Sequence, residues 1–375
     1  VVSRLVSGIE FLLKKNKINV INGHASFINK NTVKVEGTAN YKVNARNIMI
    51  ATGSKISKVN IPGIDLPFVL NSTTALESSE LPESITIIGG GVIGMEFAFI
   101  YKNFGVKVNV IEFLDRTLSM VDKDVSREIQ KICKREKINV YTSSRVTQIK
   151  RADNGQAEIT YEDKKGEHHL VSDKVLVAIG REPNIEGLEL TNSGVELNDR
   201  GRGIKVNEAM QTNVENIYAI GDVTDILQLA HVASHQAFVA VDNILNKASS
   251  MYYKAVPNVI FTSPEIATVG IGEDKAKEEG LDVAVSKVNF MGNGKAISMN
   301  ETRGFVKLVK NKENEKIIGA SIIGPDASSL ITTLTTAIAK GMTDDEINKI
   351  IFPHPTTGEV IQEASQALGL GPIHG

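Results

Sequence analysis

The residues best suited to chemistry are three glycines and an acid, spaced as in a dinucleotide-binding turn. Gly89, Gly91 and Gly94 follow the apolar run Ile85–Ile88, and Glu112 ends the next apolar run. In such a turn the glycines allow a tight bend, close approach of backbone to pyrophosphate, and close packing of helix on strand. The following helix directs its N-terminus at the phosphates, and the acid accepts hydrogen bonds from the ribose. We therefore predict a dinucleotide site; the alternative is a βα turn that binds nothing.

A second candidate is a histidine between two prolines. Pro353 and Pro355 hold the backbone around His354 extended and stiff. An imidazole fixed in this way is suited to donate or accept a proton near neutral pH, and Glu359 is placed to orient it. A structural role stays open for each residue. His354 could be only a rigid loop residue, and Glu359 could complete a capping box with Thr356 at the start of the last helix.

Two buried strands end in small or acidic residues. The strand over residues 47–51 is followed by Thr52-Gly53-Ser54, and the strand over 216–220 is followed by Gly221-Asp222. The carboxyl ends of strands are where α/β sheets bind ligands. Asp222 is suited to accept hydrogen bonds from a ribose or another polyol. The alternative is that Asp222 caps the helix that runs through Leu229 to about Leu245.

Composition narrows the class of protein. The 375 residues suggest two or three domains, and a net charge of −2 favours neither nucleic acid nor an anionic membrane as a partner. We find no apolar run long enough to span a membrane and no signal peptide. Cys133 is the one cysteine, which excludes a disulfide framework or a thiolate metal site within this chain. We expect it to be a buried apolar residue.

Hydrophobic patterns predict the remaining elements. We expect an amphipathic helix over residues 2–14, a linker over 62–82, a helix over 122–137, and an α+β region from about residue 255. The strands expected before that region cover residues 18–21, 25–28, 32–35, 139–141, 146–150, 158–161, 169–171 and 173–179. The later strands cover 258–261, 267–271, 283–288, 305–308 and 316–323, and the later helices 326–340, 344–349 and 359–368.

One pattern occurs twice in the first half. A meander followed by a buried strand ends in Ala-Thr-Gly at residues 51–53 and in Ala-Ile-Gly at residues 178–180. Only the second copy follows a strand–helix–strand unit with a dinucleotide turn. The chain also begins with Val1 inside a helical pattern. We therefore expect an internal duplication whose first dinucleotide-binding half precedes Val1.

In their order along the chain, these motifs resemble the flavin-dependent pyridine nucleotide–disulfide oxidoreductases. The resemblance covers the whole chain and is carried by Ala51–Ser54, Gly89–Glu96, Glu112, Ala178–Arg181, Tyr218–Asp222, Leu229–His231, Ser263–Glu265, and His354–Thr356 with Glu359. It implies an α/β fold with tandem FAD- and NAD-binding Rossmann-like domains, the FAD domain incomplete, and an α+β dimerisation domain. The implied domains are the remaining FAD-binding part at 1–80, NAD binding at 81–205, a return segment at 206–252, and dimerisation at 253–375.

The resemblance also implies roles for individual residues. NAD would be held by Gly89, Gly91, Gly94, Glu96, Glu112, Val146 and Gly180. FAD would lie along Ala25, Thr52, Gly53, Ser54, Asp222, Leu229, Ala230 and His231. Glu96 would also lie near the flavin, where the family pairs it with a lysine. His354, paired with Glu359, would be the acid–base for the dithiol of the partner subunit of a homodimer.

The implied function is oxidation of protein-bound dihydrolipoamide with NAD+ through FAD and a redox disulfide. Glu112 favours NAD over NADP because a carboxylate repels a 2′-phosphate. The partner would be the lipoyl domain of a 2-oxo acid dehydrogenase or glycine cleavage complex, in the cytoplasm or, in a eukaryote, the mitochondrial matrix. The alternatives are a related NAD(P)H-dependent disulfide reductase, such as one acting on glutathione, and a non-catalytic NAD-binding dimerisation module.

The chain departs from the family at two points. The Cys-x4-Cys redox pair is not in this sequence, so we expect the chain alone to be inactive. The usual His-x-His-Pro motif has Phe352 at its outer histidine, whereas the inner histidine is retained as His354.

Overall fold

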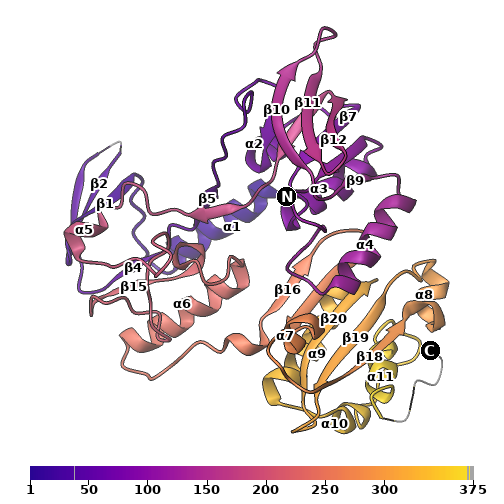
Figure 1. Ribbon diagram of the computed structural model, residues 1–375. Helices are drawn as coiled ribbons and strands as arrows, with labels where there is room; N and C mark the ends of the chain where they lie inside the picture. The colour runs from indigo at the N-terminus through magenta and orange to yellow at the C-terminus, as the bar shows by residue number, and fades with distance from the viewer. Residues whose placement is uncertain (38, 370, 372–375) are drawn as a thin grey trace. The chain divides into compact units, whose positions relative to one another are not determined.

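A computed structural model describes residues 1–37, 39–369 and 371 (Figure 1). The chain divides into two compact units. The first contains Val1–Lys55 and Arg181–Met251, and the second contains Ile56–Gly180 and Tyr252–Gly375. Each unit is described by itself below.

The second unit contains a five-stranded parallel sheet that carries the glycine-rich turn. Its strand order is β6-β13-β7-β8-β9. The strands are β6 (Val69–Asn71), β13 (Lys174–Val177), β7 (Ser84–Ile88), β8 (Lys107–Ile111) and β9 (Asn139–Tyr141). Helices α3 (Val92–Asn103) and α4 (Lys123–Arg135) contribute to the core with Ile85 and Ile87. Ile88 belongs to another core cluster, so β7 is buried on both faces, which explains its uninterrupted apolar sequence.

An antiparallel meander packs into that second core cluster. Its strands are β10 (Arg145–Arg151), β11 (Ala157–Asp163) and β12 (Gly166–Ser172). Ile149, Ile159 and Tyr161 meet Ile88 and Ile111 there. The predicted meander is confirmed, with each strand one to three residues longer than expected at its ends.

The linker expected over residues 62–82 is wrong. Residues 69–71 form β6, which pairs in parallel with β13, and α2 (Ser72–Glu77) follows at once. The Asn71 side chain accepts hydrogen bonds from the backbone N–H groups of Thr73 and Thr74 and so caps α2. The polar run that resembled a loop is therefore a helix start. Residues 56–80 lie in the second unit; the predicted four-part domain division stays a prediction.

The C-terminal part of the second unit is an antiparallel sheet with the strand order β16-β17-β20-β19-β18. The strands are β16 (Pro257–Ile260), β17 (Glu265–Gly270), β18 (Val283–Asn289), β19 (Phe305–Asn311) and β20 (Ile317–Gly324). The helices are α7 (Glu273–Glu278), α8 (Gly294–Met299), α9 (Ala327–Lys340), α10 (Asp344–Asn348) and α11 (Glu359–Gln366), with η2 (Tyr253–Ala255) and η3 (Phe290–Gly292). The α+β layout was predicted, but the short α7 and α8 were not.

A buried lysine joins the part that carries the glycine-rich turn to the C-terminal sheet. The Lys307 side chain on β19 is only 1% exposed, and its Nζ lies 2.7 Å from Asp122, 2.6 Å from Asp124 and 3.4 Å from Glu273. Asp122 also accepts the backbone N–H of Glu273 at 3.0 Å, at the start of α7. Burial raises the pKa of Asp124, but the hydrogen bond and charge of Lys307 outweigh it, and the pKa lies below its ordinary value. These groups form a charge cluster within one unit.

The first unit is built around a short pair of parallel strands. β4 (Ile48–Ile50) pairs with β15 (Ile217–Ala219), and both meet Phe27 in one core cluster. The other elements are α1 (Val2–Lys15), β1 (His24–Asn29), β2 (Thr32–Glu36), β3 (Tyr41–Asn44), β5 (Ser54–Ile56), β14 (Arg181–Pro183), α5 (Leu190–Ser193), η1 (Gly221–Thr224) and α6 (Ala230–Ile244). α1 is helical as predicted, and it buries none of its residues.

The strand predicted over residues 18–21 is wrong. These residues have no regular structure, and the third strand of the meander is β3, in the order β1-β2-β3. Alternating apolar residues suggested the strand, but a strand also needs a partner for its backbone groups. β3 takes that place by pairing with β2.

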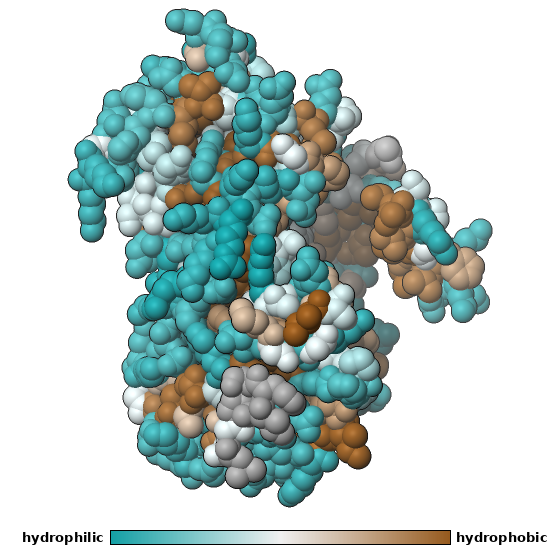
Figure 2. All heavy atoms as spheres, turned by 90° about the vertical axis from the view of Figure 1, so that its right-hand side faces the viewer, coloured by the Kyte–Doolittle hydropathy of each residue, from teal (hydrophilic) through white to brown (hydrophobic). Residues whose placement is uncertain are grey.

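The surface is mainly polar on the face that Figure 2 shows, with separate hydrophobic patches. Among the described residues, no helix is both long and apolar enough to cross a membrane.

Candidate functional site

The glycine-rich turn has the geometry that its sequence predicts. Gly89 has φ +109°, which L side chains rarely adopt, and any Cβ there would collide with the carbonyl of Ala178. A Cβ at Gly94 would collide with the carbonyl oxygen of Gly89. A Cβ at Gly91 would meet nothing within 4 Å. Gly89 and Gly94 are thus required for packing, whereas Gly91 borders open space.

The start of α3 is open for an anion. Gly91 is its N-cap residue and provides no side-chain hydrogen bond to the first turn. The first N–H groups of the helix therefore keep their partial positive charge for a ligand. This arrangement and the open space at Gly91 fit the pyrophosphate of a dinucleotide.

The structure brings Glu112 to the turn. Glu112 is 9% exposed, and its carboxylate accepts the backbone N–H of Gly90 at 2.5 Å and that of Leu114 at 2.7 Å. β7 and β8 are neighbouring parallel strands, so the turn after β7 and the acid after β8 lie at the same edge of the sheet. Ribose binding by Glu112 stays a prediction; the hydrogen bonds give it a second role in holding the turn.

The other predicted NAD residues lie in the same unit. Gly180 follows β13 with φ +122°, two residues after the carbonyl that lies against Gly89. Val146 lies on β10, half-buried. Glu96 lies on α3 and accepts the backbone N–H of Phe261 at 2.9 Å. Burial raises the pKa of Glu96, and that hydrogen bond opposes the shift only in part.

Predicted FAD residues gather at one edge of the first unit. Ser54 follows β4 and Asp222 follows β15, and the hydroxyl of Ser54 donates to Asp222 Oδ2 at 2.5 Å. Arg181, which was not among the predicted site residues, donates from Nε to Ser54 Oγ at 2.8 Å and from Nη2 to the Ser54 carbonyl at 2.7 Å. Its position directly after a strand-ending glycine was the available signal.

The neighbouring residues are held by long-range hydrogen bonds. Thr52 Oγ1 donates to the carbonyl of Asn184 at 2.7 Å. Gly53, with φ +68°, has nothing within 4 Å of a Cβ position. The exposed edge and the carboxylate beside it fit a polyol-bearing cofactor such as FAD.

The alternative role of Asp222 as a helix cap is wrong. α6 begins at Ala230 and its N-cap is Leu229, whereas Asp222 lies in η1. Ala230 and His231 are exposed at the start of α6. Ala25 lies exposed on β1.

His354 is exposed on an anchored loop. Its side chain is 81% exposed, and Nδ1 lies 2.8 Å from Oε1 of Glu359. Because a carboxylate only accepts, Nδ1 carries the proton in this contact and Nε2 of the neutral ring is left as the base. Only half of the predicted capping box is formed. Oε2 of Glu359 accepts the backbone N–H of Thr356 at 2.9 Å, but the Thr356 hydroxyl donates to the carbonyl of Pro353, and α11 has Gly358 as its N-cap.

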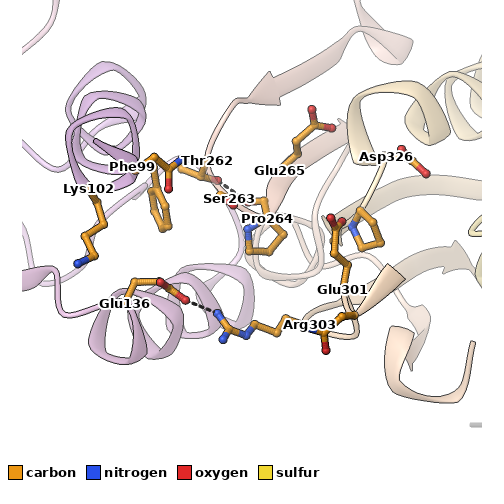
Figure 3. Close-up of a pocket in the computed structure, with 14 residues that line it drawn as sticks. Phe99, Lys102, Glu136, Thr262, Ser263, Pro264, Glu265, Glu301, Arg303 and Asp326 are labelled. Carbon is orange, nitrogen blue, oxygen red and sulfur yellow. Dashed lines mark hydrogen bonds and ion pairs between the residues drawn. The ribbon is translucent and has the colours of Figure 1, made fainter. Parts of the chain in front are cut away.

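The second unit has several cavities, and two of them bear on the candidate site. One of about 290 Å³ is lined by His354 and Glu359 together with residues of α11. Another, of about 480 Å³, lies between α3, the end of α4 and loops of the C-terminal sheet, where Arg303 reaches Glu136 (Figure 3). Neither the glycine-rich turn nor His354 lines the second cavity.

Cys133 is a structural residue. It is fully buried on α4, and burial raises the pKa of its thiol to about 12. A thiol that stays protonated and buried is inert toward disulfides, so the prediction of a buried apolar residue is confirmed.

The fold and these sites define a class of protein: an oxidoreductase that uses two dinucleotide cofactors. Residues 1–237 match the pyridine nucleotide-disulphide oxidoreductase family, and residues 256–365 match the dimerisation domain of the same family. The chain belongs to this family, which uses FAD and NAD, and its dimerisation domain supports a homodimer.

Similar proteins include dihydrolipoyl dehydrogenases. That of Geobacillus stearothermophilus is 41% identical over 377 residues, covering 100% of this chain and 79% of its own length. That of Staphylococcus aureus is 40% identical, with 100% and 80% covered. These likenesses confirm the predicted family and α/β fold.

Solved structures show the same fold. The HOCl-induced flavoprotein disulfide reductase RclA from Escherichia coli, as its Cu(II) complex, has a TM-score of 0.88 at 30% identity, covering 97% of this chain and 84% of that one. LpdA from Mycobacterium tuberculosis has a TM-score of 0.90 at 25% identity, covering 98% and 81%.

Proposed function

We propose that these residues serve NAD+-dependent oxidation of protein-bound dihydrolipoamide. The observation that carries the proposal is the contact between His354 Nδ1 and Glu359, which leaves the other ring nitrogen to act on an approaching thiol. The relatives named dihydrolipoyl dehydrogenase at about 40% identity support this substrate over other disulfides.

In this proposal His354 takes the proton of the substrate thiol at Nε2, and Glu359 stabilises the imidazolium that forms. A thiolate, not a thiol, is the nucleophile that attacks a disulfide. The 81% exposure of His354 fits a base that works against a second surface rather than inside its own unit. We propose that this surface is the partner subunit of the homodimer.

The nucleotide end of the reaction depends on the glycine-rich turn. Backbone N–H groups at the start of α3 bind the pyrophosphate, and Glu112 directs the site toward NAD+ by repelling a 2′-phosphate. Gly180, Val146 and Glu96 border the same site in this proposal. When bound, the flavin and the nicotinamide supply the electron and hydride transfer.

The edge formed by Ser54 and Asp222 would hold the flavin cofactor through its polyol chain. Asp222 would accept hydrogen bonds from hydroxyl groups, as the Ser54 hydroxyl already donates to it. Thr52, Gly53 and the start of α6 at Leu229, Ala230 and His231 would lie along the same cofactor, with Ala25 on β1.

We also propose that these 375 residues alone do not oxidise a dithiol. A redox disulfide requires two cysteines, and Cys133 is the only one in the sequence. The partner that presents the substrate would be the lipoyl domain of a 2-oxo acid dehydrogenase or glycine cleavage complex.

The test uses the chain joined to a Cys-x4-Cys segment of the family, loaded with FAD. We expect His354→Gln to lower dihydrolipoamide oxidation by at least about 100-fold, because the thiol loses its general base. NADH oxidation by ferricyanide, which bypasses the dithiol, should be unchanged. Unaltered dihydrolipoamide turnover in the variant would disprove the role of His354, and a preference for NADP+ in the same assay would disprove that of Glu112.

A further inference from the structure

The loop that carries His354 is held at two successive residues by side chains from other elements. Asn293 Nδ2 donates to the carbonyl oxygen of Thr356 at 3.0 Å. The hydroxyl of the next residue, Thr357, donates to Oδ2 of Asp326 at 2.9 Å. Asn293 and Thr357 are 8% and 6% exposed, so water competes little for either hydrogen bond.

Both the nitrogen and the oxygen of the Asn293 side-chain amide are hydrogen-bonded. It is the N-cap of α8, and its Oδ1 accepts the backbone N–H of Ala296 at 2.8 Å. Ala296 is fully buried in the core of the C-terminal sheet. With its oxygen committed to the helix, the amide can only present its N–H₂ group to the loop. The core of the domain is therefore linked directly to the backbone of Thr356.

Glu359 extends this link to the imidazole. Its Oε2 accepts the backbone N–H of Thr356 at 2.9 Å, while Oε1 contacts His354 Nδ1 at 2.8 Å. An exposed ring has little packing to hold it, so these hydrogen bonds determine its orientation and its tautomer. The order of contacts is thus Ala296, Asn293, Thr356, Glu359 and His354.

We propose that Asn293 is a positioning residue for His354, with Thr357 as a second anchor of the same loop. Asn293 holds Thr356 where Glu359 can keep the proton on Nδ1, which leaves Nε2 as the base. The role of the His354 imidazole as a base rests on the proposed function. Its positioning by Asn293 does not, because it follows from the contacts within this chain.

The test measures the imidazole directly in the chain as it is. Ring nitrogens of the seven histidines are labelled with ¹⁵N, and the His354 signals are assigned by their loss in His354→Gln. Asn293→Ser keeps an N-cap for α8 but is too short to reach Thr356. We expect its His354 signals to change from a fixed Nδ1–H tautomer to the mixture of a free imidazole. Thr357→Val, which removes the other anchor, should produce the same change to a smaller extent.

Ser298→Ala is the matched control. It removes a hydroxyl hydrogen bond on α8, from Ser298 to the carbonyl of Lys295, without touching the loop, so the His354 signals should not move. If Asn293→Ser leaves these signals as in the parent, the proposal is wrong. If Asn293→Ser fails to fold, Thr357→Val decides in the same way.

Turnover separates this proposal from the proposed function. In the protein that carries the redox cysteines, Asn293→Ser should lower kcat for dihydrolipoamide about 10- to 100-fold, with KM for NAD+ unchanged. A changed tautomer with unchanged kcat would support the positioning role and overturn His354 as the base. An unchanged tautomer would overturn the positioning role whatever the rate.

Discussion

The glycine-rich turn and the His354 loop are two ways of building a site. The turn is made of backbone: Gly89 and Gly94 pack against carbonyl groups, and Glu112 is buried against the N–H of Gly90. The loop instead presents a side chain, and the imidazole of His354 is 81% exposed. In the proposed function, the turn binds its nucleotide with groups of its own segment, whereas the imidazole acts only when another surface meets it.

The two regions also depend on different parts of the sequence. The turn and its acid come from one continuous strand–helix–strand segment. The loop depends on Asn293 and Asp326, which lie 63 and 31 residues before their partners and in separate elements. We expect damage to the turn to be local, and damage around the loop to act through the packing of the C-terminal sheet.

Replacing Lys307 should produce the largest effect, because it lies between the two regions. Lys307→Met removes the cation that pairs with buried Asp122, whereas Asp124 and Glu273 keep their pairs with the exposed Lys287 and Lys277. Breaking a buried charge cluster in this way costs about 3–5 kcal/mol of unfolding free energy. Urea denaturation of the parent and of Lys307→Met, monitored by circular dichroism, measures the difference in unfolding free energy. Lys131→Met, at an exposed pair with Glu128, is the control and should cost less than about 1 kcal/mol.

The same cluster predicts a dependence on acid. The pKa of Asp124 lies below its ordinary value, and so does that of Glu273, through hydrogen bonds from Lys277 and the charge of Lys307. An acid whose pKa is lowered in the folded state stabilises the protein above about pH 4. This stabilisation is lost as the pH falls through the pKa of the folded state. The parent should therefore lose more unfolding free energy than Lys307→Met between about pH 5 and pH 2. Parallel losses in the two proteins would contradict this.

The glycine-rich turn offers a matched pair of substitutions. Gly94→Ala forces a Cβ against the carbonyl of Gly89, so we expect a loss of about 3 kcal/mol in stability and of NADH binding. Gly91→Ala has open space around its Cβ and φ −74°, so its stability should change by less than about 0.5 kcal/mol. If that space receives the pyrophosphate, Gly91→Ala should still weaken NADH binding about tenfold in a fluorescence titration. Equal NADH affinity in the parent and Gly91→Ala would mean that the phosphates lie elsewhere.

The contrast between the turn and the loop also explains which features could be predicted from the sequence. The turn, Glu112 and the His354–Glu359 contact depend on residues close in sequence or on a known spacing, and the structure brings each of these together. Long periodic segments such as α3 and α4 were predicted for the same reason. Their hydrogen bonds form within the segment, so local pattern is sufficient.

The strands that were missed are short, and one of them also depends on a distant partner. β6 and β3 are strands of three and four residues, and β6 pairs with a strand about 100 residues later. Residues 18–21 show the opposite error, since they have the pattern of a strand without forming one. The partners of buried Lys307 and of Arg181 could not be predicted, because only the folded chain brings them together; the glycine before Arg181 marks a strand end but does not indicate Ser54 as a partner.

We expect the smallest effect at the edge of the first unit. This edge combines a backbone turn, as at the glycine-rich site, with side-chain contacts, as at the His354 loop. Ser54 connects the guanidinium of Arg181 to the carboxylate of Asp222, and Ser54→Ala removes that connection. Loss of one partly buried hydrogen bond costs about 1 kcal/mol, so FAD affinity should fall about fivefold in a flavin fluorescence titration. Ser193→Ala, which removes a hydroxyl bond to Leu190 in the same unit, should leave FAD affinity unchanged. If both variants weaken FAD binding equally, the edge acts through the stability of the unit; if only Ser54→Ala does, the side-chain contacts orient Asp222 toward the cofactor.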